Sequence, residues 1–119
     1  MDQNVLKEFC TQLKKIKYKN VLQELKLEYN TDEECPFIYL GLIKIKKSQQ
    51  CLGYGSAVMS DIIKLSDREQ LELRLYATDI YGAELRRLYG FYRKHGFVLS
   101  GNNKDSRFVY RPKKTLKRL

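Results

Sequence analysis

Two glycines and a glutamine lie close together in the segment "QQCLGYGSAV", residues 49 to 58. Gly53 and Gly55 follow Gln50, between an apolar segment and a stretch with helical periodicity. At such a junction, main-chain N–H groups and the positive end of a helix can bind phosphate oxygens. Glycine suits this role because a phosphate close to the backbone leaves no room for a Cβ, and the loop can require a positive φ. A tight strand-to-helix turn without a ligand is the alternative interpretation.

The spacing excludes two familiar nucleotide-binding loops. A dinucleotide fingerprint needs a third glycine where Val58 stands, and a P-loop needs a lysine that Gly55-Ser56-Ala57 lacks. The pattern Gln/Arg-x-x-Gly-x-Gly/Ala, here Gln50-x-x-Gly53-x-Gly55, instead resembles the acyl-coenzyme A pyrophosphate loop of the GNAT-type N-acetyltransferases.

A second segment resembles the same family. The stretch "LYGFYRKHGF", residues 88 to 97, is similar to a later helix whose signature is an apolar residue, Tyr, three variable positions and Gly-Phe. Phe91, Tyr92, Gly96 and Phe97 fill that signature here. The two segments stand in the family's order, with the strand-like "LELRLYA" between them, and the resemblance to a small, minimal GNAT-type member covers residues 37 to 111.

The apolar spacing predicts the elements that position these segments. We expect helices over 2–17, from Val58 to Leu65 with a break at Ser66-Asp67, and over 85–92 with Gly96 as C-terminal cap. Alternation and apolar runs predict strands over 19–30, 37–45 and 71–77, and a hairpin of 96–100 with 107–112. Gly41 inside the second strand indicates a bulge or a close backbone approach. The fold class is therefore α/β, with an α+β mixed sheet and a parallel unit from 37 to 77.

The resemblance implies a GNAT-like acyl-coenzyme A N-acyltransferase fold, with helices flanking a sheet splayed open between the strands at 37–45 and 71–77. Acetyl-coenzyme A would lie in that gap, with its pantetheine on the first strand and its pyrophosphate on the loop amides, and no metal is implied. The implied cofactor-binding residues are Leu42, Ile43, Lys44, Ile45, Gln50, Cys51, Leu52, Gly53, Tyr54, Gly55 and Ser56. The matching tyrosine commonly protonates the departing thiolate, which makes Tyr92 the candidate catalytic residue.

The general base is not assigned by the sequence. An amine must lose a proton before it attacks a thioester, and the strand at 37–45 contains no acid. Glu28, Glu33 or Glu34 could act as the general base through a water molecule; the alternative is that they are solvated surface charges. The family often has an asparagine where this chain has Leu85, so the hold on the cofactor differs there.

Charge supplies a second hypothesis. The formal net charge is +9, and the segment "RPKKTLKRL" at the end of the chain is strongly basic, so nucleic acid is a possible partner. Lys44, Lys46 and Lys47 either attract the cofactor phosphates or form a solvated basic edge, and His95 is expected to favour the negative end of its helix.

Length and composition set the remaining limits. The 119 residues fit one domain, which we place at 1–111 with a basic tail at 112–119. The longest apolar run is too short to span a bilayer, and the N-terminus shows no signal-peptide core. The odd number of cysteines, three, suits free thiols in a reducing compartment. We therefore expect a cytoplasmic protein.

The first hypothesis is an N-acetyltransferase that moves acetyl from acetyl-coenzyme A to an amine by direct attack. The alternative is a basic module on the same fold that binds nucleic acid or protein, with weak or lost catalysis. The acceptor amine is not identified.

Overall fold

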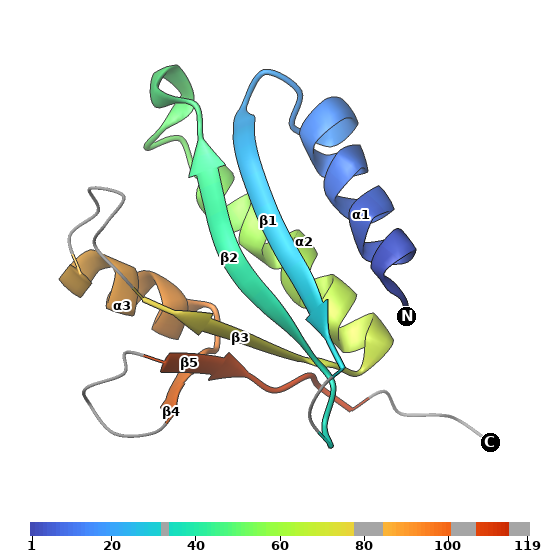
Figure 1. Ribbon diagram of the computed structural model, residues 1–119. Helices are drawn as coiled ribbons and strands as arrows, with labels where there is room; N and C mark the ends of the chain where they lie inside the picture. The colour runs from blue at the N-terminus through green and yellow to red at the C-terminus, as the bar shows by residue number, and fades with distance from the viewer. Residues whose placement is uncertain (32–33, 78–84, 101–106, 115–119) are drawn as a thin grey trace.

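The computed structural model describes residues 1–31, 34–77, 85–100 and 107–114 (Figure 1). The helical elements in chain order are α1 (Gln3–Gln12), a π-helical turn η1 (Leu13–Lys17), a 3₁₀ turn η2 (Lys47–Gln49), α2 (Tyr54–Glu69) and α3 (Leu85–Lys94). The strands are β1 (Leu22–Asn30), β2 (Phe37–Ile45), β3 (Glu72–Tyr76), β4 (Val98–Ser100) and β5 (Arg107–Tyr110). The predicted α/β class with a mixed sheet is confirmed.

The sheet has the strand order β1-β2-β3-β5-β4. β2 and β3 run parallel, with α2 between them in the chain, and the other neighbours are antiparallel. α2 and α3 cover the same face of the sheet. Phe108 and Tyr110 share a face because they lie two apart on β5. Tyr110 donates a hydrogen bond to Asp67 of α2, and the ring centroids of Phe108 and Tyr89 of α3 lie 5.1 Å apart.

The first helix ends differently from the prediction. Asp2 caps α1 by accepting a hydrogen bond from the Val5 amide, and Leu6 and Leu13 are buried in the core as expected. Ile16, which the spacing placed on the same apolar stripe, is 74% exposed. The reason is the π-helical turn, which holds more residues per turn than an α-helix and moves Ile16 away from the core.

The predicted end of the second helix at Ser66-Asp67 is wrong. α2 continues to Glu69 and ends at Gln70, which adopts the left-handed conformation with φ 54°. Ser66 is fully buried, and its hydroxyl donates to the carbonyl oxygen of Leu71 beyond the helix. Serine and aspartate favour turns when their side chains bond to the nearby backbone. Here both side chains bond outside the helix, so the helix is not interrupted.

Asp67 joins α2 to the start of the C-terminal segment. Its Oδ1 atom accepts hydrogen bonds from the Tyr110 hydroxyl and the Lys113 amide, both at 2.9 Å. Gln70 donates to the Lys113 carbonyl oxygen at 2.7 Å. Burial, followed by the contact with Asp67, raises the pKa of Tyr110 to about 12. Residues 115–119 of the predicted tail lie outside the described residues, and the boundary at 111 stays a prediction.

The buried hydroxyl of Ser66 is expected to contribute to stability. Ser66→Ala leaves the Leu71 carbonyl oxygen without its side-chain donor, so the free energy of unfolding should fall by about 1–2 kcal/mol. Ser60→Ala, in the same helix but only partly buried, is the matched control and should change it less. Urea unfolding of both variants measures the difference, and equal effects would contradict the role of the Ser66 hydroxyl.

Candidate functional site

β2 and β3 separate soon after they begin. They pair only from Phe37 to Tyr39 on β2, opposite Glu72 to Arg74 on β3. Beyond Tyr39, β2 continues to Ile45 in a ladder with β1 alone among the described strands, and Figure 1 shows the two strands diverging. The backbone of β2 from Leu40 to Ile45 therefore has no paired strand on its β3 side among the described residues, and we refer to this break in the pairing as the gap.

A β-bulge at Gly41 accompanies the separation. Lys26 and Leu27 are consecutive on β1, yet they pair with Leu42 and Leu40, so Gly41 is the extra residue. A Cβ at Gly41 would meet the Cβ of Lys26 at 3.5 Å, an ordinary contact. The bulge predicted from the sequence is confirmed, and a bulge bends its strand.

The loop after β2 is bent by two residues with positive φ. Cys51 has φ 64° and Gly53 has φ 86°, both in the left-handed region. The side chain of Gln50 donates a hydrogen bond to the Ile45 carbonyl oxygen at 3.1 Å, which connects the loop to the end of β2. Gln50 therefore shapes the loop through its side chain, and Gly53 permits the conformation that starts α2.

The first turn of α2 presents unpaired amides. The first amide of this helix with a backbone acceptor is that of Ala57, which donates to the Gly53 carbonyl oxygen at 3.1 Å. The amides of Tyr54, Gly55 and Ser56 precede it and have no acceptor within the helix, as in any α-helix. No acidic side chain lies in this turn. The helix dipole adds partial positive charge, so the turn can bind an anion.

Gly55 leaves space beside this turn. A Cβ built there would meet only the Phe91 ring, at 4.0 Å, and a Cβ at Gly53 would meet nothing within 4 Å. Contacts inside the protein therefore do not require glycine at position 55. The absence of a side chain leaves the backbone open to a bound group, and this arrangement fits the diphosphate of coenzyme A.

Tyr92 lies in an aromatic cluster on α3. Its ring centroid is 5.5 Å from that of Phe108, 5.7 Å from Phe91 and 5.8 Å from Phe97. Burial raises the pKa of Tyr92, so the phenol is protonated at neutral pH. Its hydroxyl has no hydrogen-bond partner within the described part of the chain. The ring of Tyr92 therefore packs against the core, and its phenol proton has no acceptor among the described residues.

His95 connects the end of α3 to the first turn of α2. Its Nε2 atom is 3.3 Å from the Ser56 Oγ, and its ring lies 4.8 Å from that of Phe91. Burial, and then the charge of Lys94, lowers the pKa of His95. Gly96, with φ 90°, provides the predicted helix cap. The contact with Ser56 was not predicted, because it joins residues 39 positions apart.

The candidate general bases that the structure describes have exposed side chains. Glu28 pairs by register with Tyr39, the last β2 residue that pairs with β3, and its side chain is exposed. Glu34 is exposed, and Glu33 lies outside the described residues.

An aromatic pair lies where β2 and β3 separate. The ring centroids of Tyr39 and Tyr76 are 6.2 Å apart, and Tyr76 is 50% exposed. This pair was not identified from the sequence. Tyr76 belongs to the alternating strand pattern, which is the signal that could have revealed it.

The described residues contain no group of three His, Cys, Asp or Glu side chains arranged to hold a metal ion. No helix among the described elements is long and apolar enough to cross a membrane.

The fold is similar to solved structures of low sequence identity. The AtaT–AtaR complex bound to DNA matches with a TM-score of 0.57 and 17% identity, over 73% of this chain and 57% of that chain. AtaTR bound with acetyl-coenzyme A matches with a TM-score of 0.53 and 18% identity, over 73% and 55% of the two chains. This chain thus spans little more than half the length of those chains, and neither a protein-family model nor a curated protein matches it. The likeness shows the fold alone, and it confirms the GNAT-like fold expected from the sequence.

The lowered pKa of His95, caused by burial and then by the charge of Lys94, predicts a dependence of stability on pH. The folded pKa lies below the ordinary value of 6.5, so the unfolded chain binds the proton more tightly. Stability is therefore expected to fall as the pH drops through 6.5 and to level off below the folded pKa. His95→Gln should flatten this part of the profile when urea midpoints are compared between pH 7.5 and pH 5. An unchanged slope in the variant would contradict the predicted shift.

Proposed function

We propose that this chain is an acetyl-coenzyme A-dependent N-acetyltransferase that transfers acetyl to an amine by direct attack. The observation that carries the proposal is the loss of β2–β3 pairing after Tyr39, on the strand that is followed by the loop and by helix amides without an acceptor in the helix. A thioester cofactor with a long pantetheine arm and a diphosphate matches that geometry. The likeness to AtaTR, a structure bound with acetyl-coenzyme A, supports it.

The backbone of this chain would hold the cofactor. In the proposal, the segment from Leu42 to Ile45 pairs with the pantetheine amides through the edge that β3 has left. The amides from Cys51 to Ser56 receive the diphosphate, and Gly55 allows its close approach. A main-chain N–H on β2 stabilises the negative charge that develops on the carbonyl oxygen during attack.

Tyr92 is the proposed general acid. Acetyl-coenzyme A supplies the thioester, whose C–S bond breaks as the amine nitrogen bonds to the carbonyl carbon. The amine loses a proton to a base through water, and Tyr92 donates its phenol proton to the sulfur. The phenol can do so because it is protonated at neutral pH and its hydroxyl is not engaged by a described residue. The acceptor is an amine whose identity we leave open.

Gly55→Glu tests the cofactor site. The resembling motif allows alanine at this position but not an acid, and a carboxylate there should compete with the diphosphate for the free amides. The loss of a charge-assisted hydrogen bond of about 1.5–3 kcal/mol corresponds to roughly 10- to 150-fold weaker affinity for acetyl-coenzyme A, which isothermal titration measures. Folding should be preserved, because the described contact of the added Cβ is at 4.0 Å and a negative charge in the first turn is favourable to the helix dipole.

Gly90→Glu is the matched control for this experiment. A Cβ at Gly90, in α3, meets no described atom within 4 Å, and the residue is exposed, so it makes the same chemical change away from the loop. Its affinity for acetyl-coenzyme A should equal that of the unmodified chain. The cofactor proposal fails if the unmodified chain shows no binding at high micromolar ligand, or if both glutamate variants bind equally well.

Tyr92→Phe tests the assigned acid. The ring contacts with Phe108 and Phe97 remain, so cofactor affinity should be unchanged, whereas turnover should fall by about 100-fold because the proton donor is lost. Release of free thiol from acetyl-coenzyme A, with a panel of amines, measures turnover. Tyr89→Phe, one turn earlier on the same helix, is the control and should retain activity. Unchanged turnover in Tyr92→Phe would remove this residue from the mechanism.

A further inference from the structure

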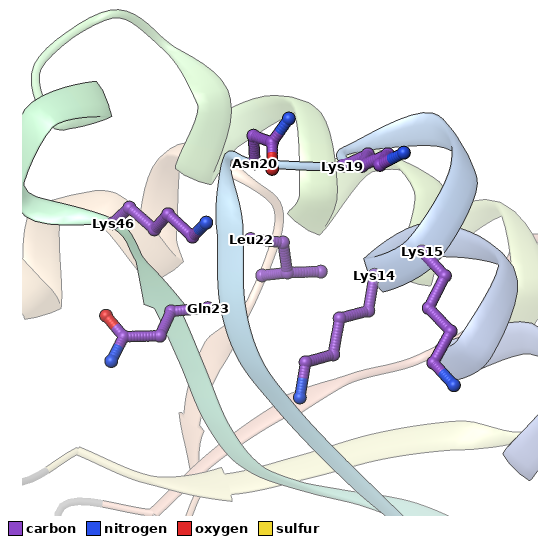
Figure 2. Close-up of a pocket in the computed structure, with 7 residues that line it drawn as sticks. All are labelled: Lys14, Lys15, Lys19, Asn20, Leu22, Gln23 and Lys46. Atoms are coloured by element: carbon purple, nitrogen blue, oxygen red, sulfur yellow. The ribbon is translucent and has the colours of Figure 1, made fainter.

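A basic hollow lies away from the proposed cofactor loop, where η1 leads into β1. Its volume is about 420 Å³, and Figure 2 shows that its lining side chains come from both sides of the first residues of β1. We call it the lysine hollow. It is lined by Lys14, Lys15, Lys19, Asn20, Leu22, Gln23 and Lys46.

The lysine hollow carries positive charge without a carboxylate in its lining. None of its four lysines forms an ion pair with any residue that the structure describes. Lys17, in the same basic stretch, is different: its Nζ lies 2.9 Å from Asp61 of α2 and outside the hollow. The charge of Lys17 is balanced by a neighbour, whereas the charges of the hollow are left for solvent or a ligand.

The backbone gathers these lysines from separate elements. Lys14 and Lys15 lie in the π-helical turn, and Lys19 follows it. Asn20, with φ 65°, turns the chain into β1. The amide of Lys46 donates to the Val21 carbonyl oxygen at 2.8 Å, which holds the end of β2 beside the same turn. Lys46 is partly buried there.

A purely structural explanation accounts for only part of this cluster. Lysines near the C-terminal end of a helix interact favourably with its dipole, which explains Lys14 and Lys15. It does not explain Lys46, which follows β2. Four like charges that line one hollow without a counter-charge favour an anionic ligand.

The composition of the hollow distinguishes between anionic partners. Protein–protein interfaces have an apolar, aromatic-rich centre, and lysine is depleted in them. The only apolar side chain in the lining is Leu22, which is 2% exposed and belongs to the core. Lysine ammonium groups together with Asn and Gln amides are the groups that contact phosphates and sugars of nucleic acids.

We propose that the lysine hollow binds the phosphodiester backbone of a nucleic acid. The site is distinct from the C-terminal tail, to which the sequence analysis assigned this partner, and it does not depend on acetyl transfer. Its contacts are with phosphates, so it would bind with little dependence on base sequence. Four lysine contacts predict a slope of log K against log[salt] of about −2.8 on single strands, added to any contribution of the tail.

Neutralising two lysines of the hollow tests the proposal. Lys15→Gln with Lys19→Gln should weaken binding to a mixed-sequence single-stranded RNA and reduce the magnitude of the salt slope by about 1.4, because two phosphate contacts are lost. Fluorescence anisotropy of the full chain between 50 and 250 mM salt measures both, and a DNA strand of the same length forms a parallel series. Acetyl-coenzyme A affinity, measured on the same double variant, should be unchanged.

Matched variants make the result decisive. Lys7→Gln with Lys64→Gln changes the net charge equally on exposed residues outside the hollow, and should leave the slope nearly unchanged. Lys114→Gln with Lys117→Gln makes the same change in the tail. Equal losses in all three double variants, or a loss in the tail variant alone, would overturn the proposal. Equal affinity for poly-glutamate of the same charge would assign the hollow to an acidic protein and would also overturn it.

Discussion

The separation of β2 from β3 is the constraint on which the proposed site depends. After three paired residues, β2 loses its parallel neighbour but keeps its ladder with β1 across the bulge at Gly41. Backbone groups freed in this way need water or a ligand as partner. The same strand then carries the chain to the Gln50 contact with Ile45 and into the first turn of α2. The gap, the loop and the helix terminus thus follow from one departure of a strand from its sheet.

α2 is the element that relates the proposed site to the rest of the core. Its N-terminal turn has no acidic side chain to neutralise the free amides, so its partial positive charge is available to an anion. Its middle is attached to the N-terminal region, because the Tyr18 hydroxyl donates to Asp61 at 2.6 Å. Its last turn carries Asp67, where a carboxylate is unfavourable to the dipole, and the donors from Tyr110 and Lys113 offset that cost. At the N-terminal end, Ser56 contacts His95 through its side chain, whereas the amides of the first turn have no acceptor among the described residues.

The parts of this structure that the sequence predicted are those with local causes. A continuous apolar run located β2 from Phe37 to Ile45 with the observed bounds, and the conformational freedom of glycine indicated the bulge at Gly41 and the cap at Gly96. The errors arose where distant residues decide the outcome. The long-range bonds of Ser66 and Asp67 extend α2, and the π-helical turn exposes Ile16. The contact of His95 with Ser56 and the lysine hollow depend on tertiary packing, so no spacing in the sequence could reveal them.

The lysines that follow the bulge of β2 do not all lie in one place. Lys44, Lys46 and Lys47 were expected to attract the cofactor phosphates or to form a basic edge, but Lys46 lines the lysine hollow. Charges separated by more than about 8 Å are largely screened at physiological ionic strength. An anion in the hollow therefore influences the loop mainly through Lys46 and the short segment that follows it. Because both regions attract negative charge, occupation of one reduces the positive potential at the other. The electrostatic part of any coupling between nucleic acid and cofactor is accordingly negative, and its strength decreases with added salt.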